Sequence, residues 1–274
     1  MMMDKTYKEH QVFTNLAEYA DFYKSLSTLV FSFATQGTKS LVNIDSYVYS
    51  SMQGTLESIN DILIKGRIGD SYALLRKYYD SVVINVYSNL YLKDARSRLE
   101  EKLTRLDTLT LEDFVVKKID NWLNGKEQLP EYRVMSSYIR KSQKLLELND
   151  LLYKDDIYKK IRNRCNDYTH YNFFYNVLFN DNGIYLKSRL KVLNIFLKDL
   201  ENIFILHFSC IFYLNEHYMM SSDYLDCLEC GVTPEEDHQY LVAPFIQEIF
   251  DTVIKKNRMD LAEKILKNTS MKLE

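Results

Sequence analysis

Residues 70–90 read Asp-Ser-Tyr-Ala-Leu-Leu-Arg-Lys-Tyr-Tyr-Asp-Ser-Val-Val-Ile-Asn-Val-Tyr-Ser-Asn-Leu. The stretch contains neither glycine nor proline, and its apolar residues recur at three- and four-residue spacings, which is typical of an α-helix. A helix that is apolar on two faces must be covered on both. The stretch therefore predicts the central helix of a bundle. The first face carries Leu75, Tyr78, Val82, Val86 and Leu90, and the second carries Tyr72, Tyr79, Val83 and Tyr87.

The rest of the chain also favours an all-α fold. Its 274 residues include only 7 glycines and 3 prolines, so tight turns are scarce and long helices are favoured. Helical periodicity predicts further long helices over residues 14–36, 43–65 and 184–220, the last being the longest. We expect a bundle of long antiparallel helices over residues 1–220 and a C-terminal helical appendage over 221–274. One single domain, 1–274, is the alternative.

Charge and hydropathy limit the possible partners. The chain carries 35 basic and 38 acidic residues, a net charge of −3, so polyanion binding has to be local. The N-terminal residues are charged where a secretory signal is apolar, and the most apolar run, 203–214, is shorter than the ~20 residues that span a membrane. We therefore expect a cytoplasmic protein with no membrane contact. Cys227 and Cys230 have the spacing of a metal pair, but no second pair follows, so free thiols are expected.

A second stretch, residues 156–172, concentrates side chains that can do chemistry: Asp-Ile-Tyr-Lys-Lys-Ile-Arg-Asn-Arg-Cys-Asn-Asp-Tyr-Thr-His-Tyr-Asn. If one helix runs through it, Arg164 and His170 are separated by about 120° and do not converge. If the helix ends at Asn166-Asp167 and Thr169 caps the next, Arg164 and His170 flank one pocket. Both geometries are open at this point.

The pattern Arg164-Cys-Asn-Asp-Tyr-Thr-His170 resembles the Arg-x(4–6)-His motif of HEPN proteins, compact helical-bundle domains that include RNA-cleaving toxins and anti-phage effectors. Its setting late in a helical bundle is similar to the abortive-infection and uncharacterised bacterial branches of that group. Cys165 stands where the motif usually has a small polar residue. The resemblance implies a HEPN-like bundle, a homodimer whose two motifs face each other, and a composite metal-independent ribonuclease site. The implied role is defence or toxin-type growth control, with a regulatory protein as a possible partner.

The chemistry implied for this site needs neither a metal nor a cofactor. Cleavage of RNA through its own 2′-hydroxyl needs one group to remove the proton and another to stabilise charge on the phosphorus. His170 suits the first role because histidine titrates near neutrality, and Arg164 suits the second because guanidinium binds phosphate. Asn166, Asp167, Tyr168 and Tyr171 are supporting candidates, with the tyrosines stacking on bases, and Lys159, Lys160 and Arg162 are candidates to hold the RNA backbone.

Two further features bear on the site. Arg76 and Asp80 form an (i, i+4) pair that either fixes helix packing or orients a functional group on a neighbouring helix. A helix expected after Ser136 or Ser137 carries a basic face, with Arg140, Lys141 and Lys144. The alternative to a ribonuclease is a non-catalytic all-helical interaction or regulatory protein that retains a HEPN-like fold.

Overall fold

The computed structural model describes residues 5–32, 35, 37–105, 108–110 and 115–274. These residues form helices and connecting turns and no β-strand, which confirms the all-α fold for this part of the chain. The α-helices are α1 (Lys5–Lys8), α2 (Gln11–Leu29), α3 (Ile44–Ile64), α4 (Ile68–Thr104), α5 (Lys117–Leu123), α6 (Tyr132–Lys141), α7 (Leu146–Leu152), α8 (Ile157–Thr169), α9 (Phe174–Leu178), α10 (Arg189–Leu214), α11 (Ser222–Glu229), α12 (Pro244–Ile249) and α13 (Met259–Asn268). The shorter helical segments are η2 (Leu41–Asn43), η4 (Gln143–Leu145), η5 (Glu216–Met219), η6 (His238–Tyr240) and η7 (Phe250–Lys255).

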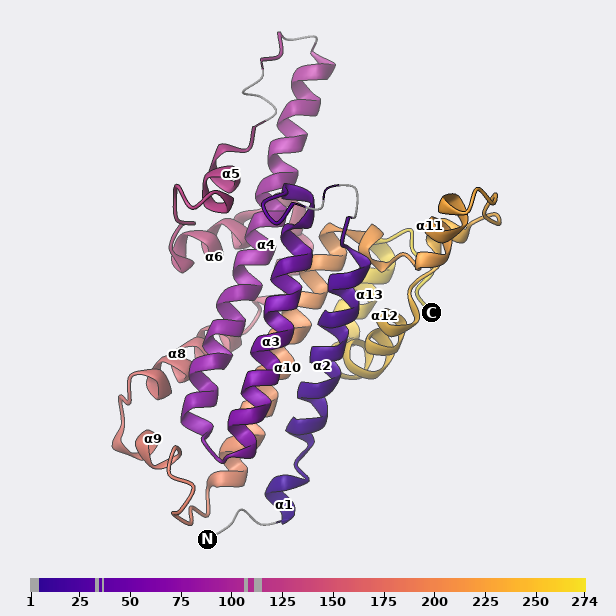
Figure 1. The fold of residues 1–274 in the computed structure, drawn as a ribbon. Coiled ribbons are helices and arrows are strands. Elements are labelled where there is room, and N and C mark those ends of the chain that lie inside the picture. The colour runs from indigo at the N-terminus through magenta and orange to yellow at the C-terminus, as the bar shows by residue number, and fades with distance from the viewer. Residues whose placement is uncertain (1–4, 33–34, 36, 106–107, 111–114) are drawn as a thin grey trace.

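Helix α4 lies between α3 and α10 on one side and α6 and α8 on the other (Figure 1). It contacts α3, α6, α8 and α10, while α2 packs against α3 and α10. Residues of both predicted apolar faces are buried, among them Tyr78 and Leu75 on one and Tyr72 and Tyr79 on the other. The two faces meet different neighbours, because Tyr72 stacks on Tyr168 of α8 and the Tyr78 hydroxyl meets the Tyr23 hydroxyl of α2 at 2.8 Å. The two-faced pattern of residues 70–90 is thus explained by a helix covered on both sides.

The longest helix is α4, with 37 residues, and not the one predicted over 184–220. From Tyr91 on it leaves the core, and exposed (i, i+4) ion pairs such as Arg96 with Glu100 line it there. Helix α10 has 26 residues and begins at Arg189. The buried Arg189 guanidinium donates to the backbone oxygens of Gly66 and Asp181, both at 2.7 Å, which holds the preceding segment in a non-helical path.

The start of α4 is tied to the segment that follows α9. The Asp70 backbone N–H donates to Oδ1 of Asn180 at 2.9 Å, and Nδ2 of Asn180 donates to the Asp70 carboxylate at 2.7 Å. Gly69 permits this approach, because a Cβ atom there would lie 2.6 Å from Asn180 Oδ1. Nδ2 of Asn180 also donates to the Tyr171 hydroxyl at 2.8 Å, so the same amide fixes the turn after α8.

A polar network crosses the otherwise apolar core. Asp45 on α3 accepts hydrogen bonds from Asn85 and Asn89 of α4 and from the Tyr218 hydroxyl. The Asn85 amide oxygen in turn lies 2.8 Å from Nε2 of His207 on α10. Burial raises the pKa of Asp45, and the three hydrogen bonds partly offset that rise. The network joins α3, α4 and α10 by satisfied polar groups, which favours one packing arrangement over others.

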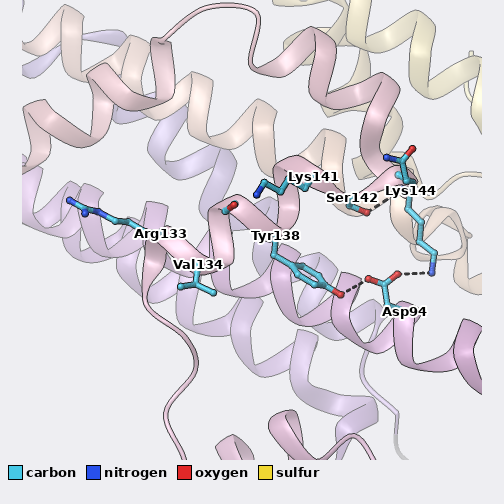
Figure 2. Close-up of a pocket in the computed structure, with 9 residues that line it drawn as sticks. Asp94, Arg133, Val134, Tyr138, Lys141, Ser142 and Lys144 are labelled. Carbon is cyan, nitrogen blue, oxygen red and sulfur yellow. Dashed lines mark hydrogen bonds and ion pairs between the residues drawn. The ribbon is translucent and has the colours of Figure 1, made fainter.

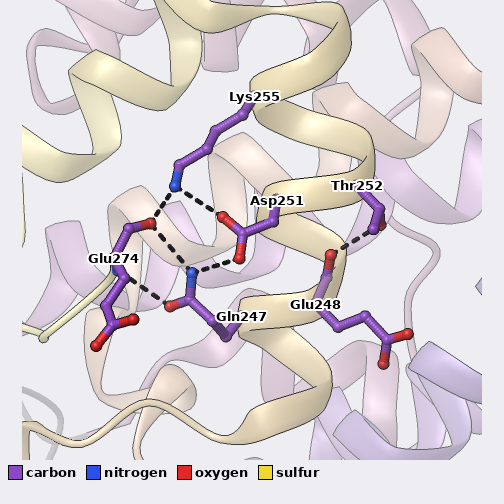
Figure 3. A network of polar contacts seen from close by, with 6 residues as sticks. All are labelled: Gln247, Glu248, Asp251, Thr252, Lys255 and Glu274. Atoms are coloured by element: carbon purple, nitrogen blue, oxygen red, sulfur yellow. Dashed lines mark hydrogen bonds and ion pairs between the residues drawn. The ribbon is translucent and has the colours of Figure 1, made fainter.

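The C-terminal helices pack on the bundle. Helix α12 contacts α2, and α13 contacts α7 and α10. Buried side chains of both, such as Ile246 and Ile265, belong to the same hydrophobic core as the bundle. Figure 3 shows the last residue, Glu274, held by Gln247 and Lys255 through hydrogen bonds to its backbone atoms. The division of the chain after residue 220 stays a prediction. No helix of the described residues is both long and apolar enough to cross a membrane.

Candidate functional site

The helix that carries the candidate motif runs without a break from Ile157 to Thr169. The Thr169 hydroxyl donates to the Cys165 carbonyl at 2.7 Å inside α8 and does not cap the next helix. Tyr171 has φ of 49°, in the left-handed region, and α9 begins only at Phe174. The continuous-helix geometry is therefore the observed one. The alternative, a break at Asn166-Asp167, is wrong, because helical hydrogen bonds continue through both residues.

Arg164 is bound by a buried carboxylate. Its Nη1 donates to both oxygens of Asp199 on α10. The Asp199 side chain is 6% exposed and the Arg164 side chain 34% exposed. Burial raises the pKa of Asp199, against the effect of the arginine. For Arg164, desolvation lowers the pKa, but the hydrogen bond and the charge of Asp199 together raise it above its ordinary value. Arg164 is thus a permanent cation that fastens α8 to α10, with part of its guanidinium open to solvent.

His170 is the C-terminal cap of α8, and its side chain is exposed. Its backbone N–H donates to the Asn166 carbonyl at 2.9 Å, while its imidazole forms no hydrogen bond with any described residue. Because they are six positions apart along one helix, Arg164 and His170 project in directions about 120° apart. Within one chain the structure does not bring the two predicted catalytic side chains together.

Asp80 joins α4 to α8. Arg162 donates from Nη1 to its carboxylate, and Arg76 lies 3.4 Å from the same group through Nε. The guanidinium of Arg162 also lies 3.3 Å from the centre of the Tyr132 ring on α6, a cation–π contact. Asp80 therefore holds Arg162 in place, and it also contributes to the packing of the two helices. The packing interpretation of the Arg76–Asp80 pair agrees with these contacts, and its role in orienting a functional group stays a prediction.

The supporting candidates have unequal surroundings. Tyr168 is buried, and its ring stacks on Tyr72 with centroids 4.2 Å apart, so it offers no face to a nucleotide base. Tyr171 is exposed, although its hydroxyl accepts from Asn180. The Asp167 carboxylate accepts from Asn172 at 2.8 Å and closes the turn after α8. Oδ1 of Asn166 is buried without a hydrogen-bond partner among the described residues. Of the two tyrosines, Tyr171 alone fits the predicted role in base stacking.

The three candidate RNA-binding cations also differ. Lys159 and Lys160 are exposed on the first half of α8, whereas Arg162 is held by Asp80. Lys159 and Arg162 line a pocket of about 350 Å³ between α6 and α8. Among the described residues that line this pocket are five cations and no carboxylate. The five are Arg133, Arg140, Lys141, Lys159 and Arg162, called the α6–α8 basic surface below.

Arg133 was not among the sequence candidates. The residue spacings of α6 held a signal for it, since Arg133 and Arg140 are seven residues apart and Lys141 follows directly. Such spacing places all three on or near one side of a helix. The convergence of that side with Lys159 depends on how α6 and α8 each pack on α4, which the sequence does not specify.

A second feature missed in the sequence is an exposed aromatic surface next to His170. Phe173 is 62% exposed and Phe174 is 77% exposed, and the adjacent Tyr171 and Tyr175 are exposed as well. The residues cluster because the chain turns sharply at Tyr171 and continues into the short helix α9. Large apolar side chains gathered at one surface position are typical of a protein interface.

The candidate metal pair gains no further ligands. Cys230 is exposed and Cys227 is half-buried, and both are free thiols. The described residues contain no group of three or more histidine, cysteine, aspartate or glutamate side chains placed to hold a metal ion. Comparison of the chain with models of protein families, with curated proteins and with solved structures finds no match. The HEPN-like assignment stays a prediction.

Proposed function

We propose that this protein is a metal-independent endoribonuclease in which His170 removes the proton of the RNA 2′-hydroxyl. The observation that supports the proposal is the position of His170, which is exposed and unpaired among the described residues at the end of α8. Lys159, Asn163 and His170 are spaced by four and seven residues, so they share one side of the helix. Lys159 and Asn163 line the cationic pocket, and eleven positions of helix put Lys159 about 16 Å from His170, which supports a phosphate contact and a base along the same side of α8 in our proposal.

The reaction follows from the chemistry of these groups. Neutral imidazole accepts the 2′-hydroxyl proton as the 2′-oxygen attacks the adjacent phosphorus, and the bond from phosphorus to the 5′-oxygen breaks. The products are a 2′,3′-cyclic phosphate and a 5′-hydroxyl end, with the proton returned to the leaving oxygen. A guanidinium near the phosphorus stabilises the charge that develops there.

The arginine of this site comes from a second subunit in our proposal. Arg164 and His170 of one chain project about 120° apart, so a site that contains both needs two copies of α8. Phe173 and Phe174 provide exposed apolar surface beside His170 for such a contact. Nη1 of Arg164 binds Asp199, while Nε and Nη2 form no hydrogen bond with a described residue, which leaves donors for a phosphate.

The test is cleavage of a mixed RNA pool in EDTA by the wild type, Arg164→Ala and His170→Ala. We expect cleavage with cyclic-phosphate ends by the wild type and none by either variant. A mixture of the two inactive variants, after subunit exchange, regains about a quarter of wild-type activity, because half of the dimers are mixed and each has one intact composite site. Recovery is absent if both groups act within one chain. Cleavage that persists in His170→Ala contradicts the proposal.

A second candidate function is a non-catalytic interaction protein of HEPN-like fold. The ion pair between Arg164 and the buried Asp199 favours it, because that contact gives the motif arginine a structural role. The burial of Cys165 in the same cluster does so too. Absence of cleavage by a folded wild-type protein on every RNA tested supports this candidate.

A further inference from the structure

We infer that the α6–α8 basic surface binds the backbone of single-stranded RNA along α6, on both sides of the helix. The inference rests on the proposed function, which identifies the bound polyanion as RNA. It adds an RNA-binding surface that lies outside the Arg164–His170 motif. Two pockets support it. The pocket of about 350 Å³ faces α8, and a larger one of about 740 Å³ lies on the other side of α6.

The two pockets are neighbours on either side of α6. Arg133, Ser137 and Lys141 line both of them, so these side chains stand on the ridge between the pockets. Figure 2 shows Arg133 and Lys141 at the edge of the larger pocket, with Val134 and Tyr138 beside them. A flexible RNA strand that crosses this ridge contacts Arg133 and Lys141 on the ridge itself. It then meets less polar surface in the larger pocket.

The charge on this surface is largely uncompensated. Arg133, Lys141 and Lys159 form no ion pair with any described residue. The one carboxylate among the residues lining the larger pocket, Asp94, accepts from the Tyr138 hydroxyl and lies 2.9 Å from Nζ of Lys144. Arg162, which lines the smaller pocket, binds the carboxylate of Asp80. Both acids are therefore occupied, and three exposed cations remain available to phosphate.

The dimensions fit a strand better than a single nucleotide. Arg133 and Lys141 are eight residues apart on α6, a distance of about 12 Å along the helix axis. Phosphates of a stacked strand rise about 3.4 Å per nucleotide, so this distance covers three to four nucleotides. A rigid duplex bridges over the ridge, whereas a single strand bends into the pockets on both sides. Val134 is exposed and gives the bases or sugars an apolar contact in the larger pocket.

The test measures binding separately from cleavage. The His170→Ala protein is titrated with a fluorescein-labelled twelve-nucleotide oligouridylate, and fluorescence anisotropy is recorded from low to moderate salt. Arg133→Ala with Lys141→Ala is compared with Lys8→Ala with Lys24→Ala, which removes two exposed cations from α1 and α2 and gives the same net charge. Circular dichroism checks that helicity is equal in both.

We expect the Arg133/Lys141 variant to bind about tenfold more weakly at low salt, and its log–log salt slope to fall by about 1.4, since each lost phosphate contact removes about 0.7. The Lys8/Lys24 variant should keep the affinity and the salt slope of the His170→Ala protein. Equal weakening in the two variants, or unchanged binding in the Arg133/Lys141 variant, overturns the inference. Stoichiometric displacement of the oligonucleotide by uridine monophosphate also overturns it, because the pockets then bind a small nucleotide. Failure of cleavage alone leaves this measurement unaffected and contradicts only the proposed function.

Discussion

The Nδ1 atom of His207 lies 2.7 Å from the hydroxyl oxygen of Tyr23 in the middle of the bundle, where neither side chain has appreciable exposure. The other ring nitrogen, Nε2, meets Asn85, so the imidazole joins α2, α4 and α10. Burial lowers the pKa of His207 to about 3, so the ring is neutral at physiological pH. Histidine within an apolar run of sequence is here a structural residue that links three helices.

The first prediction concerns stability below neutral pH. Because His207 binds a proton only in the unfolded chain between about pH 6.5 and pH 3, its contribution to stability is complete above pH 6.5 and is lost as the pH falls toward 3. From pH 7 to pH 5, the contribution of His207 to the free energy of unfolding should fall by about 2 kcal/mol. Urea unfolding at both pH values, compared between wild type and His207→Gln, measures it. If the free energy of unfolding falls equally in the wild type and in His207→Gln, another group is responsible for the pH dependence.

The second prediction separates structure from catalysis at Arg164. Removal of the guanidinium leaves the Asp199 carboxylate buried without its partner, so Arg164→Ala should lower the free energy of unfolding by about 2 kcal/mol, reduced by the partial exposure of the arginine. Arg164→Met with Asp199→Leu replaces both charges by apolar groups and should recover most of that loss.

The double variant serves as the control for RNA cleavage. If Arg164 stabilises the developing charge, the double variant is stable and inactive. If it recovers activity together with stability, the arginine acts only through the fold, and thermal unfolding and cleavage change in parallel.

The third prediction concerns the turn beside His170. A Cβ at Gly69 meets the Asn180 amide at 2.6 Å, and this amide binds both Asp70 and Tyr171. Gly69→Ala should therefore cost about 1–3 kcal/mol. Gly54→Ala is the matched control, because nothing lies within 4 Å of a Cβ there and alanine favours the interior of α3, with a gain of about 0.5–1 kcal/mol. Thermal unfolding of both variants should show opposite signs, and a stabilised Gly69→Ala contradicts the contact.

Local pattern and tertiary contact explain which parts of this molecule the sequence could predict. The helix expected over 43–65 is observed as Ile44–Ile64, because its periodicity depends only on residues within it. The burial of Tyr168 was also readable, since Tyr158, Ile161, Cys165 and Tyr168 follow helical spacing. In contrast, Arg164 meets Asp199 across 35 positions and Arg162 meets Asp80 across 82. Such pairs depend on how helices pack, and one sequence holds no local signal for them.

The last prediction concerns the assembly of the proposed composite site. Phe173 and Phe174 are the most exposed aromatic side chains beside His170, and two copies of this surface would bury them against each other. Burial of one phenylalanine is worth about 1.5–3 kcal/mol, so Phe173→Ser with Phe174→Ser should weaken dimerisation by about a hundredfold or more. Sedimentation equilibrium measures the change. Ile64→Ser is the control, because Ile64 is 54% exposed on α3 and lies outside this surface.

The same phenylalanine variant should also lose the recovery of activity in mixtures of Arg164→Ala and His170→Ala subunits, because that recovery requires two chains in contact. A variant that stays dimeric and still complements contradicts the placement of the interface at Phe173 and Phe174. A wild-type protein that is monomeric at all concentrations and nevertheless cleaves RNA contradicts the composite site itself, because Arg164 and His170 of one continuous helix do not face each other.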